Sequence, residues 1–175
     1  MSIIETERLI LRRFSAEDWK DLFEYLSDWQ VVKYEPYDTY TEEECKQEVI
    51  TRSVNPAFWA VVLKDSNKLI GNIYFEGKEC DTWELGYVFN KAFQGFGYAT
   101  ESSRAIMEHA FKKLNARRIM ARCNVENSAS WKLLERLKMR REGHFLKVTY
   151  FKKDVHNNPI WIDAYEYAVL KDEWD

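Results

Sequence analysis

Apolar residues recur with strand or helix periodicity along most of this 175-residue chain. The range from Thr6 to Phe14 predicts a strand. Ser15-Ala-Glu-Asp18 has the composition of a capping box, and apolar residues at helical spacing follow it from Trp19 to Leu26. Thr41-Glu-Glu-Glu44 is a second capping box, which opens a more polar helix that should end before Asn55-Pro56.

Three strand-like runs follow, at Phe58–Leu63, Leu69–Phe75 and Trp83–Phe89. The first two are separated by Lys64-Asp-Ser-Asn67, a composition suited to a hairpin turn. A glycine-containing loop from Gln94 to Tyr98 comes next.

That loop leads into a long amphipathic helix. We expect its buried stripe to contain Ser103, Ile106, Met107, Ala110, Phe111 and Leu114. We expect its solvent face to contain Glu101, Arg104, Glu108 and Lys112.

The remainder predicts a short strand, a helix and two β-rich runs. These are Arg118–Cys123, a helix from about Asn127 to Leu137, and the runs Phe145–Phe151 and Trp161–Leu170, linked by Asp154–Pro159. The order of elements predicts one α/β domain over residues 1–175. Its sheet should be antiparallel at the start, with a strand–helix–strand crossover in the middle.

Charge and cysteine content exclude several classes of function. The formal net charge is −3, and no basic stripe suited to a nucleic acid occurs. The densest basic stretch, from Arg136 to Arg141, is flanked by Glu135 and Glu142, which favours a solvated helix end. The 3 cysteines are widely spaced without a Cys-x-x-Cys pair, which argues against a disulfide framework and a zinc site.

No signal peptide is visible, and no apolar run approaches the roughly 20 residues that span a bilayer. We therefore expect a cytoplasmic protein with no membrane partner, no nucleic-acid partner and no metal.

The loop Gln94-Gly-Phe-Gly-Tyr-Ala99 carries the clearest chemical signal. Successive backbone N–H groups at a helix start can bind a pyrophosphate, and glycine allows its close approach. No Walker lysine is present, and Thr100 stands where a dinucleotide fingerprint needs glycine. Coenzyme A remains as a ligand, but a glycine turn that merely caps the helix is an equally good interpretation of this loop by itself.

The flanking residues decide between these interpretations. Gln94-x-x-Gly97-x-Ala99 resembles the signature of the GNAT superfamily of acyl-CoA-dependent N-acyltransferases. Thr6–Arg12, Glu84–Val88 and Asn127-x-x-Ser130 resemble, in order, segments of its ribosomal-protein N-terminal acetyltransferase branch. The resemblance spans nearly the whole chain.

This resemblance implies a single-domain GNAT fold, with a mixed, mostly antiparallel central sheet of about seven strands flanked by about four helices. It implies acetyl-CoA as the co-substrate. The residues that it assigns to coenzyme binding are Tyr87, Val88, Phe89, Gln94, Gly95, Phe96, Gly97, Tyr98, Ala99, Thr100, Asn127 and Ser130.

The resemblance also suggests roles at the reacting centre. The backbone N–H of Val88 would meet the thioester carbonyl, where a donor stabilises developing charge. Glu84, on the same strand face, is the best candidate for the base, although a structural ion pair explains it equally well. Asp163 is a weaker alternative.

Many family members protonate the leaving thiolate with a tyrosine at the position that Leu134 occupies here. The ribosomal-protein branch instead has a serine at the fourth position of the helix motif, which is Ser130 here. The resemblance therefore predicts that Ser130 lies near the coenzyme sulfur, as proton donor or through a water, although a serine that only helps to start the helix is the alternative. It also predicts that Asn127 binds the pantetheine amide. The family usually ends this helix with Gly-Phe, which suits a left-handed cap, whereas this chain has Lys138-Met139.

Two segments should determine the acceptor, Trp29–Tyr40 and Lys152–Pro159. The first is aromatic and acidic, which suits a cationic amine, although a packed loop would look the same. We expect an N-acetyltransferase acting on a primary amine, first of all a protein or peptide N-terminus. The alternatives are a small-amine acetyltransferase and an acyl-CoA-binding regulator without turnover. The protein could be a monomer or a homodimer.

Overall fold

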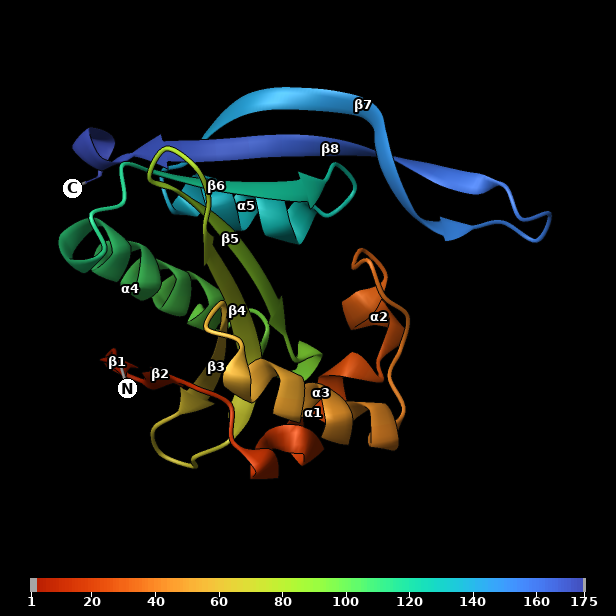
Figure 1. Cartoon of the computed structure of the whole chain (residues 1–175), viewed down its shortest axis with the longest axis horizontal. Coiled ribbons are helices and arrows are strands. Elements are labelled where there is room, and N and C mark those ends of the chain that lie inside the picture. The colour runs from red at the N-terminus through yellow and green to blue at the C-terminus, as the bar shows by residue number, and fades with distance from the viewer. Residues whose placement is uncertain (1–2, 175) are drawn as a thin grey trace.

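An eight-stranded sheet forms the body of the molecule, with helices on both of its faces (Figure 1). The computed structural model describes residues 3–174. The strands are β1 Ile4–Glu5, β2 Leu9–Arg12, β3 Phe58–Leu63, β4 Leu69–Gly77, β5 Thr82–Phe89, β6 Arg118–Asn124, β7 Arg140–Lys153 and β8 Pro159–Leu170. Their order is β1-β2-β3-β4-β5-β6-β8-β7, and only the β5–β6 pair is parallel.

The alternation of side chains along the strands produces two cores. On β3, Val61 belongs to the core beneath α4 and α5, whereas Ala60 and Val62 belong to the core beneath α1 and α3. The helices are α1 Trp19–Leu26, α2 Trp29–Val32, α3 Glu42–Val54, α4 Tyr98–Lys113 and α5 Ser128–Arg136. None of the helices within residues 3–174 is long and apolar enough to cross a membrane.

The predicted crossover is confirmed as β5–α4–β6. The paired register of β5 and β6 covers only Thr82–Glu84 and Arg118–Met120. Beyond those residues the two strands point apart (Figure 1). The edge of β5 from Leu85 to Phe89 is therefore left without a neighbouring strand on the β6 side.

The α/β fold class is confirmed, with differences in the elements. The sheet has eight strands instead of about seven, because the short β1 pairs with β2. The four-residue α2 lies in a segment that was expected to be a loop. Strands β7 and β8 extend beyond their predicted bounds because they pair with each other along a protruding hairpin (Figure 1).

Two side chains of α4 differ from the predicted faces. Leu114 lies at the helix end and is 40% exposed, so it does not continue the buried stripe. Glu101 does not simply face water, because its carboxylate accepts hydrogen bonds from Thr6 Oγ1 at 2.6 Å and from Arg8 Nε at 2.7 Å. These bonds attach the start of α4 to the N-terminal segment.

Candidate coenzyme and acceptor sites

The loop between β5 and α4 has the backbone that its glycines predicted. Gly95 and Gly97 both adopt the left-handed region, with φ of 85° and 84°, and Gly97 is the N-cap of α4. No hydrogen bond within residues 3–174 uses the backbone N–H groups of Gly95, Phe96 or Gly97. These donors precede the first turn of a 16-residue helix, so the loop is suited to bind an anion.

Arg8 supports this loop from outside. Its Nη1 donates to the carbonyl oxygen of Phe96 at 3.1 Å, and its guanidinium lies 4.5 Å from the ring centroid of Tyr98. Its Nη2 forms an ion pair with Glu101 at 2.6 Å. Gln94 fixes the other end, because its side-chain amide donates to the carbonyl oxygen of Phe89 at 3.1 Å.

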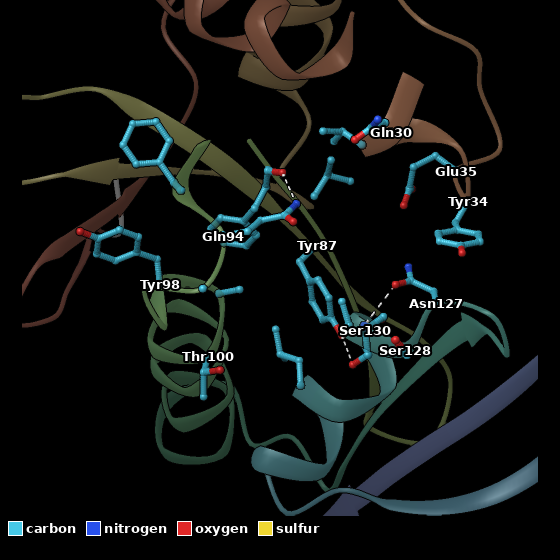
Figure 2. A pocket seen from close by; sticks show the side chains of 18 of the residues that line it. Gln30, Tyr34, Glu35, Tyr87, Gln94, Tyr98, Thr100, Asn127, Ser128 and Ser130 are labelled. Carbon is cyan, nitrogen blue, oxygen red and sulfur yellow. Dashed lines mark hydrogen bonds between the residues drawn. The ribbon is translucent and has the colours of Figure 1, made fainter. Parts of the chain in front are cut away.

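A first cavity of about 570 Å³ opens beside the loop. Its wall is formed by α2 and the segment after it, the end of β5, the loop, the start of α4 and one face of α5 (Figure 2). Among its lining residues are Tyr87, Val88, Phe89, Gln94, Gly95, Gly97, Tyr98, Ala99, Thr100, Asn127 and Ser130. Of the predicted coenzyme residues, only Phe96 is outside this lining, and its side chain is exposed.

The cavity also contains two cations that sequence reasoning did not assign to the site. Arg136 lines it from α5, with Nε donating to Thr100 Oγ1 at 3.4 Å, and Lys33 lines it from the segment after α2. Arg136 therefore belongs to the cavity wall and not to a merely solvated helix end. The free N–H groups and the cations of this cavity suit a pyrophosphate, and the apolar Val88, Phe89 and Leu133 suit an uncharged arm.

Tyr87 and Ser130 form a hydrogen-bonded pair at the inner end of this cavity. The two hydroxyl oxygens are 2.9 Å apart, and the Tyr87 hydroxyl also reaches the Ser130 carbonyl oxygen at 3.1 Å (Figure 2). Burial raises the pKa of Tyr87 far above its ordinary value, so the phenol stays protonated at neutral pH. Leu134 is fully buried in the core, and Tyr87 instead supplies a tyrosine hydroxyl here.

Asn127 is the N-cap of α5. Its Oδ1 accepts the backbone N–H of Ser130 at 3.2 Å, so the amide side chain orients the residue that pairs with Tyr87. Ser130 is therefore not needed as the helix cap.

A second cavity of about 720 Å³ adjoins the first. The two share Tyr34, Glu35, Tyr87, Val88, Asn127 and Ser130. The second cavity extends over β4, β5 and β6 and is roofed by Val148, Phe151 and Ile162 of the β7–β8 hairpin.

Lys152 holds the hairpin against the segment around α2. Its Nζ is 2.9 Å from a carboxylate oxygen of Asp38 and 3.8 Å from the ring centroid of Trp29. The two segments that the sequence assigned to the acceptor, 29–40 and 152–159, are therefore in contact.

The carboxylates of the second cavity differ in their partners. Glu84 lies 3.1 Å from Lys78 Nζ, which also pairs with Glu76. Asp163 is outside the lining of both cavities, and its Oδ1 accepts the backbone N–H of Lys147 at 2.8 Å. Within residues 3–174, no group of three or more His, Cys, Asp and Glu side chains is arranged to bind a metal ion.

Glu35 was recognised in the sequence only as part of an acidic, aromatic segment. Its carboxylate points into the cavity (Figure 2), and no hydrogen bond or ion pair within residues 3–174 engages it. Burial raises the pKa of Glu35 to about 7, although the nearby Arg52 opposes this shift. A local sequence pattern cannot reveal this property, because it depends on residues from β5, α3 and α5 that surround the side chain.

Comparisons with known proteins agree with this geometry. The family model of an acetyltransferase (GNAT) domain matches residues 8–140. An uncharacterized N-acetyltransferase of Bacillus subtilis strain 168, YnaD, is 40% identical over 98% of this chain and 99% of its own length.

Two solved structures extend the comparison. The crystal structure of a GNAT-family acetyltransferase from Bacillus anthracis has a TM-score of 0.88 at 36% identity, covering 98% of this chain and 100% of that chain. A ribosomal-protein-S5-alanine acetyltransferase from Vibrio fischeri has a TM-score of 0.76 at 24% identity, covering 100% of both chains. The second comparison supports the shared fold alone.

Proposed function

The chain belongs to the GNAT family of N-acetyltransferases, and on this basis we propose that its acceptor is the N-terminal amine of a protein or peptide. The observation that carries the proposal is the junction of two cavities at Tyr87, Val88 and Ser130. One cavity has the donors for a coenzyme, and the other has room for an acceptor.

The first cavity is assigned to acetyl-CoA, which supplies the acetyl group as a thioester. The free N–H groups of Gly95, Phe96 and Gly97 would hold the pyrophosphate. Arg136 and Lys33 add positive charge in the same cavity. The apolar wall, with Asn127 at its inner end, suits the pantetheine arm.

At the junction, different groups of the chain would stabilise the developing charge and donate a proton to the sulfur. A backbone N–H on the open edge of β5 would stabilise negative charge on the acetyl oxygen. The register pairs Val88 with Asn72 in phase with the bond from the Asn90 N–H to the Ile70 oxygen, so the N–H groups of Tyr87 and Phe89, and not the expected one of Val88, face this edge. Ser130, hydrogen-bonded to Tyr87, would return a proton to the sulfur. Glu84 remains a candidate base, but its carboxylate already contacts Lys78 Nζ at 3.1 Å, so an incoming amine would have to displace that partner.

An N-terminal amine as the acceptor is supported by the relatives and by chemistry. A Putative ribosomal N-acetyltransferase, YdaF of Bacillus subtilis strain 168, is 29% identical over 92 residues. An α-amine has a pKa of about 7.7–8.0, so a base near neutrality is sufficient to deprotonate it.

A small free amine is the second candidate, because the second cavity is partly roofed by the hairpin and is large enough for such a molecule. The test is release of free coenzyme A thiol from acetyl-CoA in the presence of N-terminal peptides or small amines. Turnover confined to peptides supports the proposal, and turnover confined to free amines moves the assignment to small molecules. Acetyl-CoA binding without turnover of any amine would identify a regulator, and absence of binding would refute the coenzyme site.

A further inference from the structure

We propose that the second cavity selects a primary amine with one ammonium group on an apolar or aromatic body, and that Glu35 binds this ammonium and accepts its proton. The inference rests on the proposed function. It adds the acceptor class and identifies a catalytic residue.

The first step concerns charge balance among the cavity carboxylates. Glu35, Glu48 and Glu84 line the cavity. Glu48 accepts a hydrogen bond from Arg52 Nε at 2.7 Å, and Glu84 pairs with Lys78 at 3.1 Å. Only Glu35 forms no hydrogen bond or ion pair through its carboxylate among residues 3–174, although the charge of Arg52 is nearby, so the cavity offers one carboxylate that can pair with a cation of the ligand.

The cations of the cavity are also paired. Arg52 is buried, and besides Glu48 it donates to Asn72 Oδ1 at 2.9 Å. Arg122 pairs with Glu166 at 2.8 Å. A polyamine would therefore find a partner for one ammonium group and leave the others without a free carboxylate.

Much of the remaining wall is apolar and aromatic, although Asn72, Asn124 and Thr149 also line it. Aromatic rings line it from the segment after α2, from β3, β4 and β5, and from the hairpin. They belong to Tyr34, Tyr37, Tyr40, Phe58, Tyr74, Tyr87 and Phe151. Such rings attract an ammonium through their faces and bury an apolar body. A second ammonium group on the acceptor would find no further unpaired carboxylate among the described lining residues.

The location of Glu35 makes it a base and not only an anchor. It lines both cavities, as Tyr87 and Ser130 do, so an amine bound to it lies at the junction. The charged and titratable groups around it are Arg52 on α3, Tyr37 in its own segment and Tyr87 on β5. Its raised pKa of about 7 suits proton transfer near neutral pH.

The step balances without an oxidant or reductant. Glu35 accepts a proton from the ammonium, which frees the nitrogen lone pair. The new C–N bond forms as the thioester C–S bond breaks, and the sulfur takes a proton from Ser130 or from water. The nitrogen loses its remaining extra proton, which restores that donor, and Glu35 releases its own proton to the solvent. The products are an N-acetyl amine and a free thiol.

The test compares Glu35→Gln, Glu84→Gln and the exposed control Glu43→Gln, with phenethylamine, spermidine and a phenylalanine-initiated tetrapeptide as acceptors. We would measure kcat/KM from pH 5.5 to 8.5. Calorimetry would measure phenethylamine binding without coenzyme, and acetyl-CoA binding separately. We expect the wild type to prefer an apolar monoamine over spermidine by at least about 10-fold. Glu35→Gln should lower kcat/KM by about 100-fold or more, remove the rise near pH 7 and weaken phenethylamine binding.

Glu35→Gln should weaken phenethylamine binding far more than acetyl-CoA binding, and Glu43→Gln should behave as the wild type. Preference for spermidine would overturn the acceptor class. If the rise of kcat/KM with pH is lost in Glu84→Gln but kept in Glu35→Gln, Glu84 is the base and the role of Glu35 is overturned. Comparing kcat/KM for the tetrapeptide with that for phenethylamine shows whether the acceptor is a peptide N-terminus or a free amine. If the wild type binds acetyl-CoA but acetylates nothing, the proposed function fails, and the calorimetry still decides whether Glu35 binds an ammonium.

Discussion

Lys138 adopts a backbone conformation at the end of α5 that usually belongs to glycine. Its φ is 60°, and the chain around it forms a Schellman motif. The N–H of Met139 donates to the carbonyl oxygen of Leu134 at 3.1 Å, and the N–H of Lys138 donates to that of Glu135 at 2.9 Å. The left-handed cap inferred from the family pattern is therefore present, but with a residue that pays a steric penalty for it.

Lys138→Gly should stabilise the protein by about 0.5–1 kcal/mol, because glycine adopts positive φ without that penalty. Urea denaturation would measure the free energy of unfolding. The matched control is Lys132→Gly inside α5, which should destabilise by about 1 kcal/mol. Equal effects of the two substitutions would show that the cap geometry does not govern stability here.

Glu35 should make stability fall as pH rises. Its folded-state pKa is raised from 4.5 to about 7, so between these values the folded chain holds a proton that the unfolded chain has lost. Stability then decreases with pH across this window and is constant above it with respect to this group. Glu35→Gln should therefore be more stable than the wild type at pH 8, by at most about 3 kcal/mol, and similar to it at pH 4.5.

Thermal unfolding of the ligand-free protein at the two pH values would measure this difference. Glu43→Gln, on the exposed side of α3, should show no comparable pH-dependent difference from the wild type. If Glu35→Gln increases stability equally at both pH values, the pKa of Glu35 is not raised in the folded state, and the increase reflects packing.

At the scale of elements, the helices and strands with long, regular apolar patterns were predicted best. The alternating runs of β3, β4 and β5 and the long stripe of α4 were predicted close to their observed bounds. Strand β1 and helix α2 were missed because two and four residues are too short for a period. The hairpin strands were predicted too short, since much of β7 is exposed and is held by pairing with β8 rather than by burial.

The candidate site likewise has a part that the sequence predicts and a part that it does not. The loop from Gln94 to Ala99 was predicted because its glycine spacing is a local sequence pattern. The pairing of Tyr87 with Ser130, the ion pair of Glu84 and the unpaired carboxylate of Glu35 depend on contacts between distant segments. No spacing in one sequence shows which carboxylate has a partner.

The loop before α4 gives a prediction at this scale. Gly97→Ala would place a Cβ 3.5 Å from Arg8 Nη2, an ordinary contact, so its cost arises from the φ of 84°. We expect a loss of about 1–2 kcal/mol in stability, or a rearranged loop. Because a rearranged loop turns its N–H groups away from the anion, the Kd for coenzyme A should rise about 10-fold.

Gly77→Ala is the matched control, since its Cβ would meet only the Trp83 ring at 3.5 Å and its φ is not positive. Coenzyme A affinity, measured by calorimetry, should be unchanged in this control. Unchanged affinity in Gly97→Ala as well would exclude the loop as the pyrophosphate site.

At the scale of the whole molecule, both cavities lie where the neighbouring strands β5 and β6 diverge. Strands β5 and β6 pair only through Thr82–Glu84, and α4 is the connection between them. On one side lie β1–β5 with α1–α3, and on the other lie β6, β8, β7 and α5 (Figure 1). A ligand that contacts β5 and α5 together therefore bridges the two parts of the sheet.

Coenzyme A should accordingly stabilise the whole protein and not only its binding loop. At 100 times its Kd, a ligand that binds the folded state alone adds about 2.7 kcal/mol. The location of the protection tests the structure. Amide hydrogen exchange should slow at Leu85–Phe89 on β5 and also at the start of α5, on the other side of the gap between β5 and β6. Protection limited to the loop at Gly95–Gly97 would mean that the coenzyme is held by its phosphates alone. In that case the divergent strands would not form the channel for its arm, and the reacting centre at Ser130 would have to be placed elsewhere.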